Sequence, residues 1–235
     1  MFLNRIQQCQ FLERKNRFLG TVICSGQKND VFIPNPGRMK ELMVKGKEMY
    51  IEEKPGPQRK TDYDLIAVKH NDVLISIDSN KPNRFMYRML SNHELPQFEG
   101  YEVVKSEPSY HSGRFDFRLE GERSILIEVK SCTLVQDGRA LFPDAPTIRG
   151  ARHVRHLALL LEEKAIDEAT VVFVIQRPDA HVFSPNWQMD PEFGAALDDA
   201  SDKGVRLLAL RTKLADWELQ FLDEVPIEIR YQRYI

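Results

Sequence analysis

The chain has 235 residues, of which 42% are hydrophobic and 29% charged. This composition is typical of a folded globular protein and excludes a disordered chain or a collagen-like fibre. The length fits one large domain or two small ones. No apolar run approaches the roughly 20 residues of a membrane helix, and the first residues lack the apolar core of a signal peptide. We therefore expect a cytoplasmic protein with no membrane partner.

The three cysteines, Cys9, Cys24 and Cys132, have no CxxC spacing. They predict neither a disulfide framework nor a zinc site, and this favours a reducing compartment.

The net charge of −2 is unevenly divided along the chain. Residues 1–90 hold 16 Lys and Arg against 10 Asp and Glu, and residues 91–235 hold 17 against 25. A basic half predicts affinity for a polyanion and an acidic half affinity for cations. Charge scattered over a mixed surface is the alternative interpretation.

Short strands between turn signals dominate the first 80 residues. The turn signals include Asn35-Pro36-Gly37 and Lys54-Pro55-Gly56-Pro57. The strands are expected at residues 18–25, 31–34, 48–53, 63–69 and 72–78, with one helical turn at 38–44. Five such strands predict a small barrel, which we take as OB-like.

The pattern changes to mixed helices and strands near residue 83. Helices are expected at 83–90, at 148–164 after an N-cap at Thr147, and from Asp190-Pro191 to Gly204. Strands are expected at 113–119, 124–132, 140–143, 170–176, 205–211 and 217–221. The prediction is an α+β protein of two domains, an OB-like β-barrel over 1–82 and an α/β domain over 83–235.

Charged residues interrupt two neighbouring strands of the second domain. In residues 113–119, Phe115, Phe117 and Leu119 are expected on one face and Asp116 on the other. In residues 124–132, an apolar run is broken at Glu128 and Lys130, which share a face. Charges inside a buried strand are costly unless they are paired or coordinated.

A hairpin centred on Glu122 brings these charges together. Positions that sum to 244 then face each other, so Asp116 lies opposite Glu128 and Arg114 opposite Lys130. Directly opposed residues have Cβ atoms about 5 Å apart. Two converging carboxylates favour a bound divalent cation, and hard oxygen ligands favour Mg²⁺ or Mn²⁺.

Asp116, Glu128 and Lys130 together have the form of a PD-(D/E)xK nuclease core. In such a site Asp116 and Glu128 bind the metal, which polarises a phosphate and activates water, while Lys130 orients the water or stabilises developing charge. An ion-pair network on a sheet face is the alternative interpretation.

Basic side chains supply candidate phosphate contacts. On the helix at 148–164 they lie opposite the apolar face without interleaved acids, although a basic outer face also serves solubility alone. In the barrel they lie near aromatic residues that could stack bases, unless Phe18, Phe32 and Tyr63 belong to the core. The candidates are Arg17, Arg38, Lys40, Arg59, Lys60, Arg114, Arg149, Arg152, Arg155, His156 and Gln176.

Several blocks of sequence resemble the sugar fermentation stimulation protein A (SfsA) family. They run in the family's order over nearly the whole chain: Pro34 to Met39, Arg59 to Asp64, Glu128 to Val135, Phe142 to Gly150, Arg152 to Leu157 and Val174 to Arg177. The resemblance implies an OB-like domain, a PD-(D/E)xK-like domain and DNA binding. It matches Asp116, Glu128 and Lys130 to the nuclease-type positions and places Glu107 as a supporting acid. Gly113 and Phe115 depart from the Ser and Ile that are usual in the family, whereas Asp116 is kept.

Two classes of function follow. One is a Mg²⁺- or Mn²⁺-dependent deoxyribonuclease acting on single- or double-stranded DNA. The other is a DNA-binding regulator, linked to sugar (maltose) metabolism, that does not cleave. No sugar-site signature supports a sugar-metabolising enzyme. The sequence leaves open a homodimer.

Overall fold

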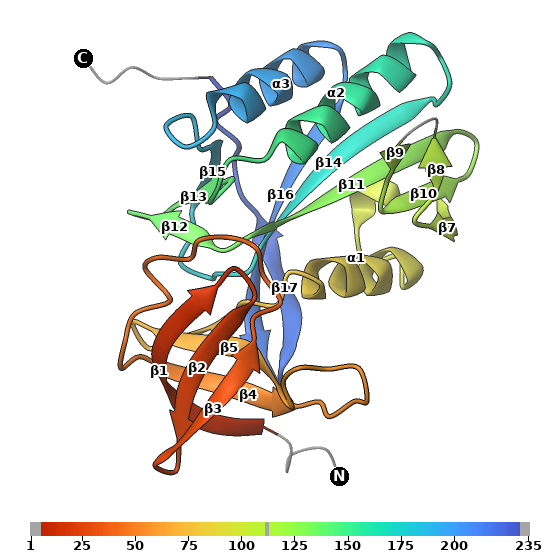
Figure 1. The fold of residues 1–235 in the computed structure, drawn as a ribbon. Coiled ribbons are helices and arrows are strands. Elements are labelled where there is room, and N and C mark those ends of the chain that lie inside the picture. The colour runs from red at the N-terminus through yellow and green to blue at the C-terminus, as the bar shows by residue number, and fades with distance from the viewer. Residues whose placement is uncertain (1–5, 111–112, 231–235) are drawn as a thin grey trace.

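The first part of the chain closes into a five-stranded barrel, which confirms the predicted OB fold (Figure 1). A computed structural model describes residues 6–110 and 113–230. β2 pairs with β1 and β3, β4 pairs with β1 and β5, and a short parallel pairing of β3 with β5 closes the barrel. The strands are β1 (Ile6–Asn16), β2 (Leu19–Cys24), β3 (Gln27–Phe32), β4 (Glu48–Glu53), β5 (Tyr63–His70) and an additional β6 (Val73–Ser76) on β5.

The sequence-based prediction missed β1, and the helical turn that it placed at residues 38–44 is one hydrogen-bonded turn that does not continue into a helix. β1 is mostly polar and buries only Cys9 and Phe11 among its 11 residues, so it gives a weak strand signal. Residues 38–44 form turns around Met39, whose carbonyl accepts from the amides of Leu42 and Met43. Met39 has a φ of 47°, a conformation that a helix does not tolerate.

The second part is an α/β domain built on a six-stranded mixed sheet in the order β17-β16-β14-β11-β10-β7. A smaller sheet orders β12-β13-β15, and β8 pairs with β9. The helices are α1 (Lys81–Ser91), α2 (Ile148–Glu162) and α3 (Pro191–Asp202), with a 3₁₀ turn at Pro96–Phe98. The strands are β7 (Glu102–Ser106), β8 (Ser109–Tyr110), β9 (Gly113–Arg114), β10 (Phe117–Glu120), β11 (Ser124–Cys132), β12 (Leu134–Gln136), β13 (Arg139–Phe142), β14 (Glu168–Ile175), β15 (Val182–Pro185), β16 (Arg206–Ala215) and β17 (Glu218–Glu224).

The central sheet is covered on both faces (Figure 1). Alternate residues of its strands point to opposite sides. Leu126, Val171 and Phe173 pack under α2 and α3. Ile127 and Val172 pack with α1 and with the outer surface of the barrel. The barrel therefore shares an apolar core with the α/β domain, in addition to its own interior.

The helix caps expected from the sequence are confirmed. Thr147 accepts a hydrogen bond from the amide of Gly150 through its side chain, at 3.0 Å. Asp190 accepts from the amide of Phe193 at the start of α3, also at 3.0 Å. Its other oxygen accepts from the amide of Thr147 at 2.7 Å, so one carboxylate ties the N-termini of α2 and α3 together.

The expected continuous strand at 113–119 is instead two short strands separated by a bend at Asp116. Phe115 packs in the core under α2, whereas Phe117 and Leu119 pack in the core over α1. Placing the three side chains on one face was therefore wrong. The bend turns Asp116 away from a regular position in β10.

Polar contacts hold the barrel against the α/β domain. The side chain of Gln176 donates to Oγ of Ser131 at 2.9 Å and to the carbonyl of Asp78 at 3.4 Å. The amide of Met39 donates to Oδ2 of Asp144 at 2.5 Å. These bonds, together with the shared core, fix the barrel relative to β11 and to the loop before α2.

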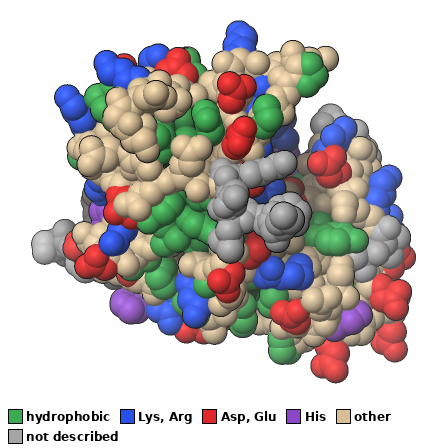
Figure 2. Space-filling view, turned by 90° about the horizontal axis from the view of Figure 1, so that it is seen from below, with side chains coloured by type: hydrophobic (Ala, Val, Ile, Leu, Met, Phe, Trp, Pro, Cys, Tyr) green, Lys and Arg blue, Asp and Glu red, His purple; other side chains and the backbone are tan. Residues whose placement is uncertain are grey.

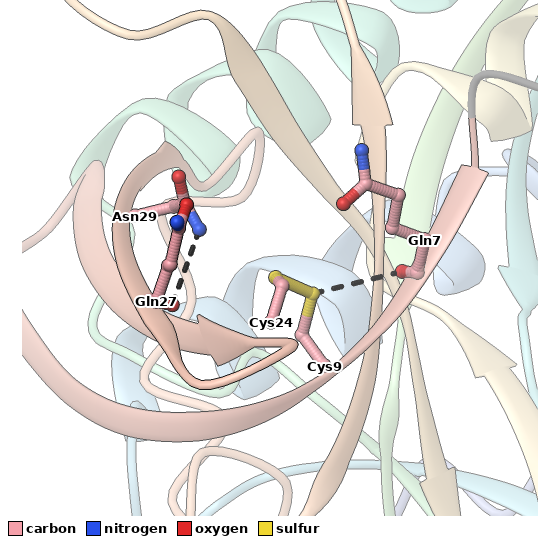
Figure 3. The surroundings of a disulfide bond; sticks show 5 residues. All are labelled: Gln7, Cys9, Cys24, Gln27 and Asn29. Atoms are coloured by element: carbon pink, nitrogen blue, oxygen red, sulfur yellow. Dashed lines mark hydrogen bonds between the residues drawn. A yellow bond between two sulfur atoms is a disulfide. The ribbon is translucent and has the colours of Figure 1, made fainter.

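The expectation of no disulfide was wrong, because Cys9 on β1 and Cys24 on the neighbouring strand β2 are bonded (Figure 3). β1 and β2 pair with Gln10 opposite Ile23, which sets Cys9 opposite Cys24 with Cα atoms 4.4 Å apart. Such a separation suits a disulfide. The pairing comes from strand register and leaves no spacing signature in the sequence. Cys132 is buried as a free thiol.

Among the helices that the structure describes, none is long and apolar enough to cross a membrane.

Replacing both Cys9 and Cys24 with alanine should lower the free energy of unfolding by about 3 kcal/mol under oxidising conditions, because the bond closes a loop 15 residues long in the unfolded chain. Urea unfolding with and without reductant measures the effect. Reductant should weaken the wild type similarly and leave the double variant unchanged. A wild type indifferent to reductant would contradict the prediction.

Candidate active site

The register of the β10–β11 hairpin is the one that the sequence predicts. Phe117 pairs with Ile127 and Glu120 pairs with Ser124. The amide of Asp116, just before β10, donates to the carbonyl of Ile127 at 3.1 Å. Oδ2 of Asp116 in turn accepts from the amide of Val129 at 2.7 Å. These bonds hold Asp116 beside the segment of β11 that carries Glu128 and Lys130.

Glu128 and Lys130 lie on one face of β11 and are in contact. Nζ of Lys130 donates to Oε1 of Glu128, and Nδ1 of His153 on α2 is 2.9 Å from the same oxygen. Glu128 is only 4% exposed. Nε2 of His153 accepts from Nε of Arg149 at 3.4 Å, which leaves Nδ1 of His153 as the donor to Glu128.

The two carboxylates have pKa values shifted in opposite directions. Burial and the neighbouring charge of Glu128 raise the pKa of Asp116, and together they outweigh the amide of Val129 and the charge of Lys130. Burial also acts to raise the pKa of Glu128, but Lys130 and His153 outweigh it and lower that pKa. Asp116 is therefore the carboxylate with an uncompensated charge.

Sequence reasoning missed two residues of this site, Asn83 and His153. Asn83 on α1 donates to Oδ1 of Asp116 at 2.5 Å. His153 follows Arg149 by one helical turn but is buried, at the edge of the apolar face of α2. A histidine flanking that face was the available signal, whereas nothing in the sequence connects Asn83 with Asp116.

Glu107 and Arg114 lie at the periphery of the site. The amide of Glu107 donates to the carbonyl of Asp116 at 2.9 Å, but its carboxylate pairs at 3.2 Å with Arg114, and both side chains are exposed. Arg114 belongs to β9 and pairs with Ser109. The expectation that Arg114 faces Lys130 was wrong, because the chain bends at Asp116.

The predicted phosphate contacts on α2 are mostly at the surface. Arg149, Arg152 and Arg155 are exposed. His156 is half-buried, with its ring centroid 5.3 Å from that of Phe115. A Cβ on Gly113 would lie 2.6 Å from Nδ1 of His156, so only glycine allows this approach. A cavity of about 400 Å³ lies along this part of α2.

The cationic candidates of the barrel are exposed too. Arg17, Arg38 and Lys40 line a groove of about 540 Å³ beside Pro146. Arg59 and Lys60 lie in the loop between β4 and β5. Seen from the barrel side, Lys and Arg are interspersed with acidic and hydrophobic side chains, and acidic ones gather at the right-hand edge of the view (Figure 2).

Gln176 differs from the other candidates, because its side chain is fully buried at the junction with the barrel. Its position offers no surface for a direct contact with nucleic acid.

A cavity of about 220 Å³ opens beside Lys130, between the barrel and the α/β domain. Asn35, Gly37 and Arg17 line it from the barrel, and the segment 141–147 lines it from the other side. A Cβ on Gly37 would come within 3.1 Å of Oδ2 of Asp144, so this glycine allows the two walls to approach closely.

The side chains at this centre fit a divalent ion held by two carboxylates. Burial and the negative charge of Glu128 raise the pKa of Asp116, and a cation bound by both carboxylates would offset both effects. Within the described residues, no group of three or more His, Cys, Asp and Glu side chains forms a metal site. Asp116 and Glu128 would supply two ligands of such an ion, with water or substrate supplying the rest.

Fold and site together define a two-domain protein with an OB barrel and an α/β domain whose central hairpin carries an Asp, Glu and Lys centre. Two family models match the chain: the SfsA N-terminal OB domain over residues 12–77 and the sugar fermentation stimulation protein RE domain over residues 80–218. The chain belongs to the SfsA family, as its sequence resemblance indicates.

Relatives match over nearly their whole length. A sugar fermentation stimulation protein homolog of Natranaerobius thermophilus is 39% identical, covering 96% of this chain and 95% of its own. One from Desulforamulus reducens is 40% identical, covering 97% and 94%. The structure of Pyrococcus furiosus SfsA in complex with Ca²⁺ is 30% identical, with a TM-score of 0.88, covering 97% of this chain and 98% of that one.

Substitution of the two carboxylates should change the pH dependence of stability in opposite directions. The raised pKa of Asp116 means that its ionised form is less favourable in the folded chain than in the unfolded chain. Ionisation of Asp116 should therefore lower the free energy of unfolding of the wild type as pH rises above about 4. The lowered pKa of Glu128 means that its charge stabilises the fold above about pH 4, and this is lost on acidification.

Urea unfolding in EDTA, between about pH 3.5 and 8, measures this difference. The free energy of unfolding of Asp116→Asn, relative to that of the wild type, should rise with pH. The same difference for Glu128→Gln should fall with pH. Glu128→Gln should cost about 2 kcal/mol at neutral pH, because it leaves Lys130 and His153 poorly paired. Parallel pH profiles for the two variants would contradict the assignment.

Proposed function

We propose that the protein hydrolyses phosphodiester bonds of DNA at the Asp116, Glu128 and Lys130 centre, with Mg²⁺ or Mn²⁺ as cofactor. The hairpin register carries the proposal, because it brings an uncompensated carboxylate against a second carboxylate that contacts a lysine. In this proposal residues 1–82 form the domain that holds DNA, and residues 83–235 carry the reacting centre.

Each residue has a separate task in the proposed reaction. A divalent ion held by Asp116 and Glu128 would polarise the scissile phosphate and lower the pKa of the attacking water. Asn83 and the amide of Val129 fix Asp116, and His153 fixes Glu128. The side chain of Lys130 is 12% exposed beside the cavity, and its ammonium group would stabilise the charge that develops on the phosphate.

The relative from Pyrococcus furiosus supports use of a divalent cation, since its structure is a complex with Ca²⁺. Ca²⁺ and Mg²⁺ share a preference for oxygen ligands, which Asp116 and Glu128 provide. Mg²⁺ often relies on one or two carboxylates together with substrate phosphates. A centre with two carboxylates fits that mode of binding.

The second candidate is a DNA-binding protein that does not cleave. The observation in its favour is that Lys130 and His153 already compensate the charge of Glu128 inside the protein. An ion-pair network of this kind needs no metal to be stable. The SfsA family name points to sugar fermentation, and a role in its regulation would require DNA binding alone.

Lys130→Ala separates metal binding from chemistry. We expect this variant to retain the rise in melting temperature that Mn²⁺ produces in the wild type, because the two carboxylates remain. Its hydrolysis of plasmid or single-stranded DNA should fall at least about 100-fold, since a stabilising charge at the reacting centre is lost. Asp116→Asn should lose both the thermal shift and the hydrolysis.

EDTA is the first control for this experiment, and an RNA substrate is the second. A wild type that binds DNA but cleaves no substrate with Mg²⁺ or Mn²⁺ would favour the non-cleaving candidate. A wild type without any metal-dependent thermal shift, alone and with DNA, would exclude the metal site.

Arginines on the outer face of α2 are expected to contact phosphates. Arg152→Ala and Arg155→Ala should each reduce the slope of log K against log salt concentration for duplex DNA by about 0.9. Arg123→Ala is a matched control, because Arg123 is exposed at the opposite end of β11 from Lys130. An equal change in slope for Arg123→Ala would contradict a specific role for α2.

A further inference from the structure

Two phenylalanines of the barrel lie at the surface and stack on each other. Phe18 is 44% and Phe32 is 36% exposed, and their ring centroids are 6.1 Å apart with an interplanar angle of 19°. Val31 and Ile33, on either side of Phe32, are completely buried. Phe32 therefore points outward from the barrel, and neither ring is needed to fill its core.

An arginine extends this pair. The guanidinium group of Arg59 lies 5.9 Å from the ring centroid of Phe32. Arg59 is ion-paired with Asp64, which sits opposite Phe32 where β3 meets β5, and Nε of Arg59 donates to the carbonyl of Thr61. These contacts fix the arginine over the ring. We call Phe18, Phe32 and Arg59 the aromatic platform.

The aromatic platform lies where OB folds bind nucleic acids. That surface is the face of the second and third strands, between the loop joining strands 1 and 2 and the loop joining strands 4 and 5. Here Phe18 comes from the β1–β2 loop, Phe32 from the end of β3 and Arg59 from the β4–β5 loop. All three parts of such a surface contribute one side chain.

A line of cationic residues connects the platform with the candidate active site. Arg17 follows directly before Phe18 in the chain. It lines the 540 Å³ groove together with Arg38 and Lys40. It also lines the 220 Å³ cavity, where Lys130 is part of the wall. A nucleic-acid strand that leaves the platform along this groove would pass Arg17, Arg38 and Lys40 before it reaches the cavity, whose lining includes Asp144 as well as Lys130.

The route is fixed in place by Arg14. Its guanidinium group donates to four backbone carbonyls, at 2.6 to 2.9 Å, which join the β1–β2 loop to the loop after β3. The carbonyls are those of Arg17, Asn35, Gly37 and Arg38. The surface between platform and cavity is thereby ordered before any ligand binds.

We propose that the aromatic platform binds unpaired bases, so that the DNA substrate has a single-stranded segment next to the phosphate at Lys130. This rests on the proposed function and names its substrate class, a single strand or a junction of single and double strand. Bases inside a duplex are stacked on their neighbours and paired, so their faces are not available to the rings. The cations along the route favour a polyanion over an apolar protein partner.

Equilibrium binding in EDTA tests the platform without cleavage. The full-length protein is titrated, by fluorescence anisotropy, into a labelled single strand, a blunt duplex and a single strand whose bases are replaced by abasic sites. Phe18→Ala and Phe32→Ala should each weaken binding of the single strand by about tenfold, because each ring stacks on a base. Binding of the blunt duplex should change less than about twofold. Phe32→Tyr, which keeps the ring, should bind as the wild type does.

The abasic strand separates base stacking from phosphate contact. The wild type should prefer the strand with bases, and a variant with both phenylalanines replaced by alanine should bind both strands equally. Phe221→Ala is the matched control, since Phe221 is 37% exposed on β17 of the other domain and should not affect binding. Circular dichroism and melting temperature confirm that each variant is folded.

Three results would overturn the proposal: no binding of the single strand by wild type, no effect of the two phenylalanine variants, or an equal loss of single-strand and duplex binding in folded variants. Cleavage is measured separately with Mn²⁺. If the phenylalanine variants lose single-strand binding and the wild type cleaves no DNA, the proposed hydrolysis is wrong and base binding by the platform stands. If the wild type cleaves DNA and the phenylalanine variants bind single strands normally, base binding by the platform is wrong and the proposed hydrolysis stands.

Discussion

The antiparallel pairing of β10 with β11 is the constraint on which the site depends. A slip of one residue would move every side chain of a strand to the opposite face. Glu128 and Lys130 would then enter the apolar core over α1, and Val129 would leave it. Ile125 and Ile127 must remain buried against α1, so the apolar core fixes the register of β11 on β10. That register in turn fixes the distance between the carboxylates of Asp116 and Glu128. The bend at Asp116 completes the arrangement by letting its side chain accept the amide of Val129.

The same burial that fixes the site also makes its charged groups energetically unfavourable unless they are paired. Glu128 is compensated by Lys130 from its own strand and by His153 from α2, whereas Asp116 has hydrogen bonds but a raised pKa. The result is a centre with one compensated and one uncompensated carboxylate, held by two helices and a hairpin. A divalent cation is the ligand that we propose for this centre, since it would supply positive charge without disturbing the core. The shared core between barrel and α/β domain keeps the barrel loops at a constant position relative to this centre.

Strongly periodic elements could be predicted from the sequence, and elements set by tertiary pairing could not. β11 was predicted at its observed bounds, and Thr147 and Asp190 cap their helices as expected, because apolar runs and caps are local signals. β1, with its many polar residues, and the disulfide between Cys9 and Cys24 depend on strand pairing and left no local trace. For the site, the convergence of Asp116 and Glu128 followed from hairpin arithmetic. The contribution of Asn83 and the burial of Gln176 required knowledge of how α1 and the barrel pack on the sheet.

The central claim is that Asp116 and Glu128 bind one ion between them. Calorimetric titration of Mn²⁺ into the wild type, Asp116→Asn, Glu128→Gln and the double variant, with a DNA strand present in each case, tests it most directly. A shared ion predicts one site in the wild type, loss of that site in either single variant, and no further loss in the double variant, because neither carboxylate binds the ion alone. Partial weakening in each single variant that adds up in the double variant would show two independent carboxylates and would contradict the account.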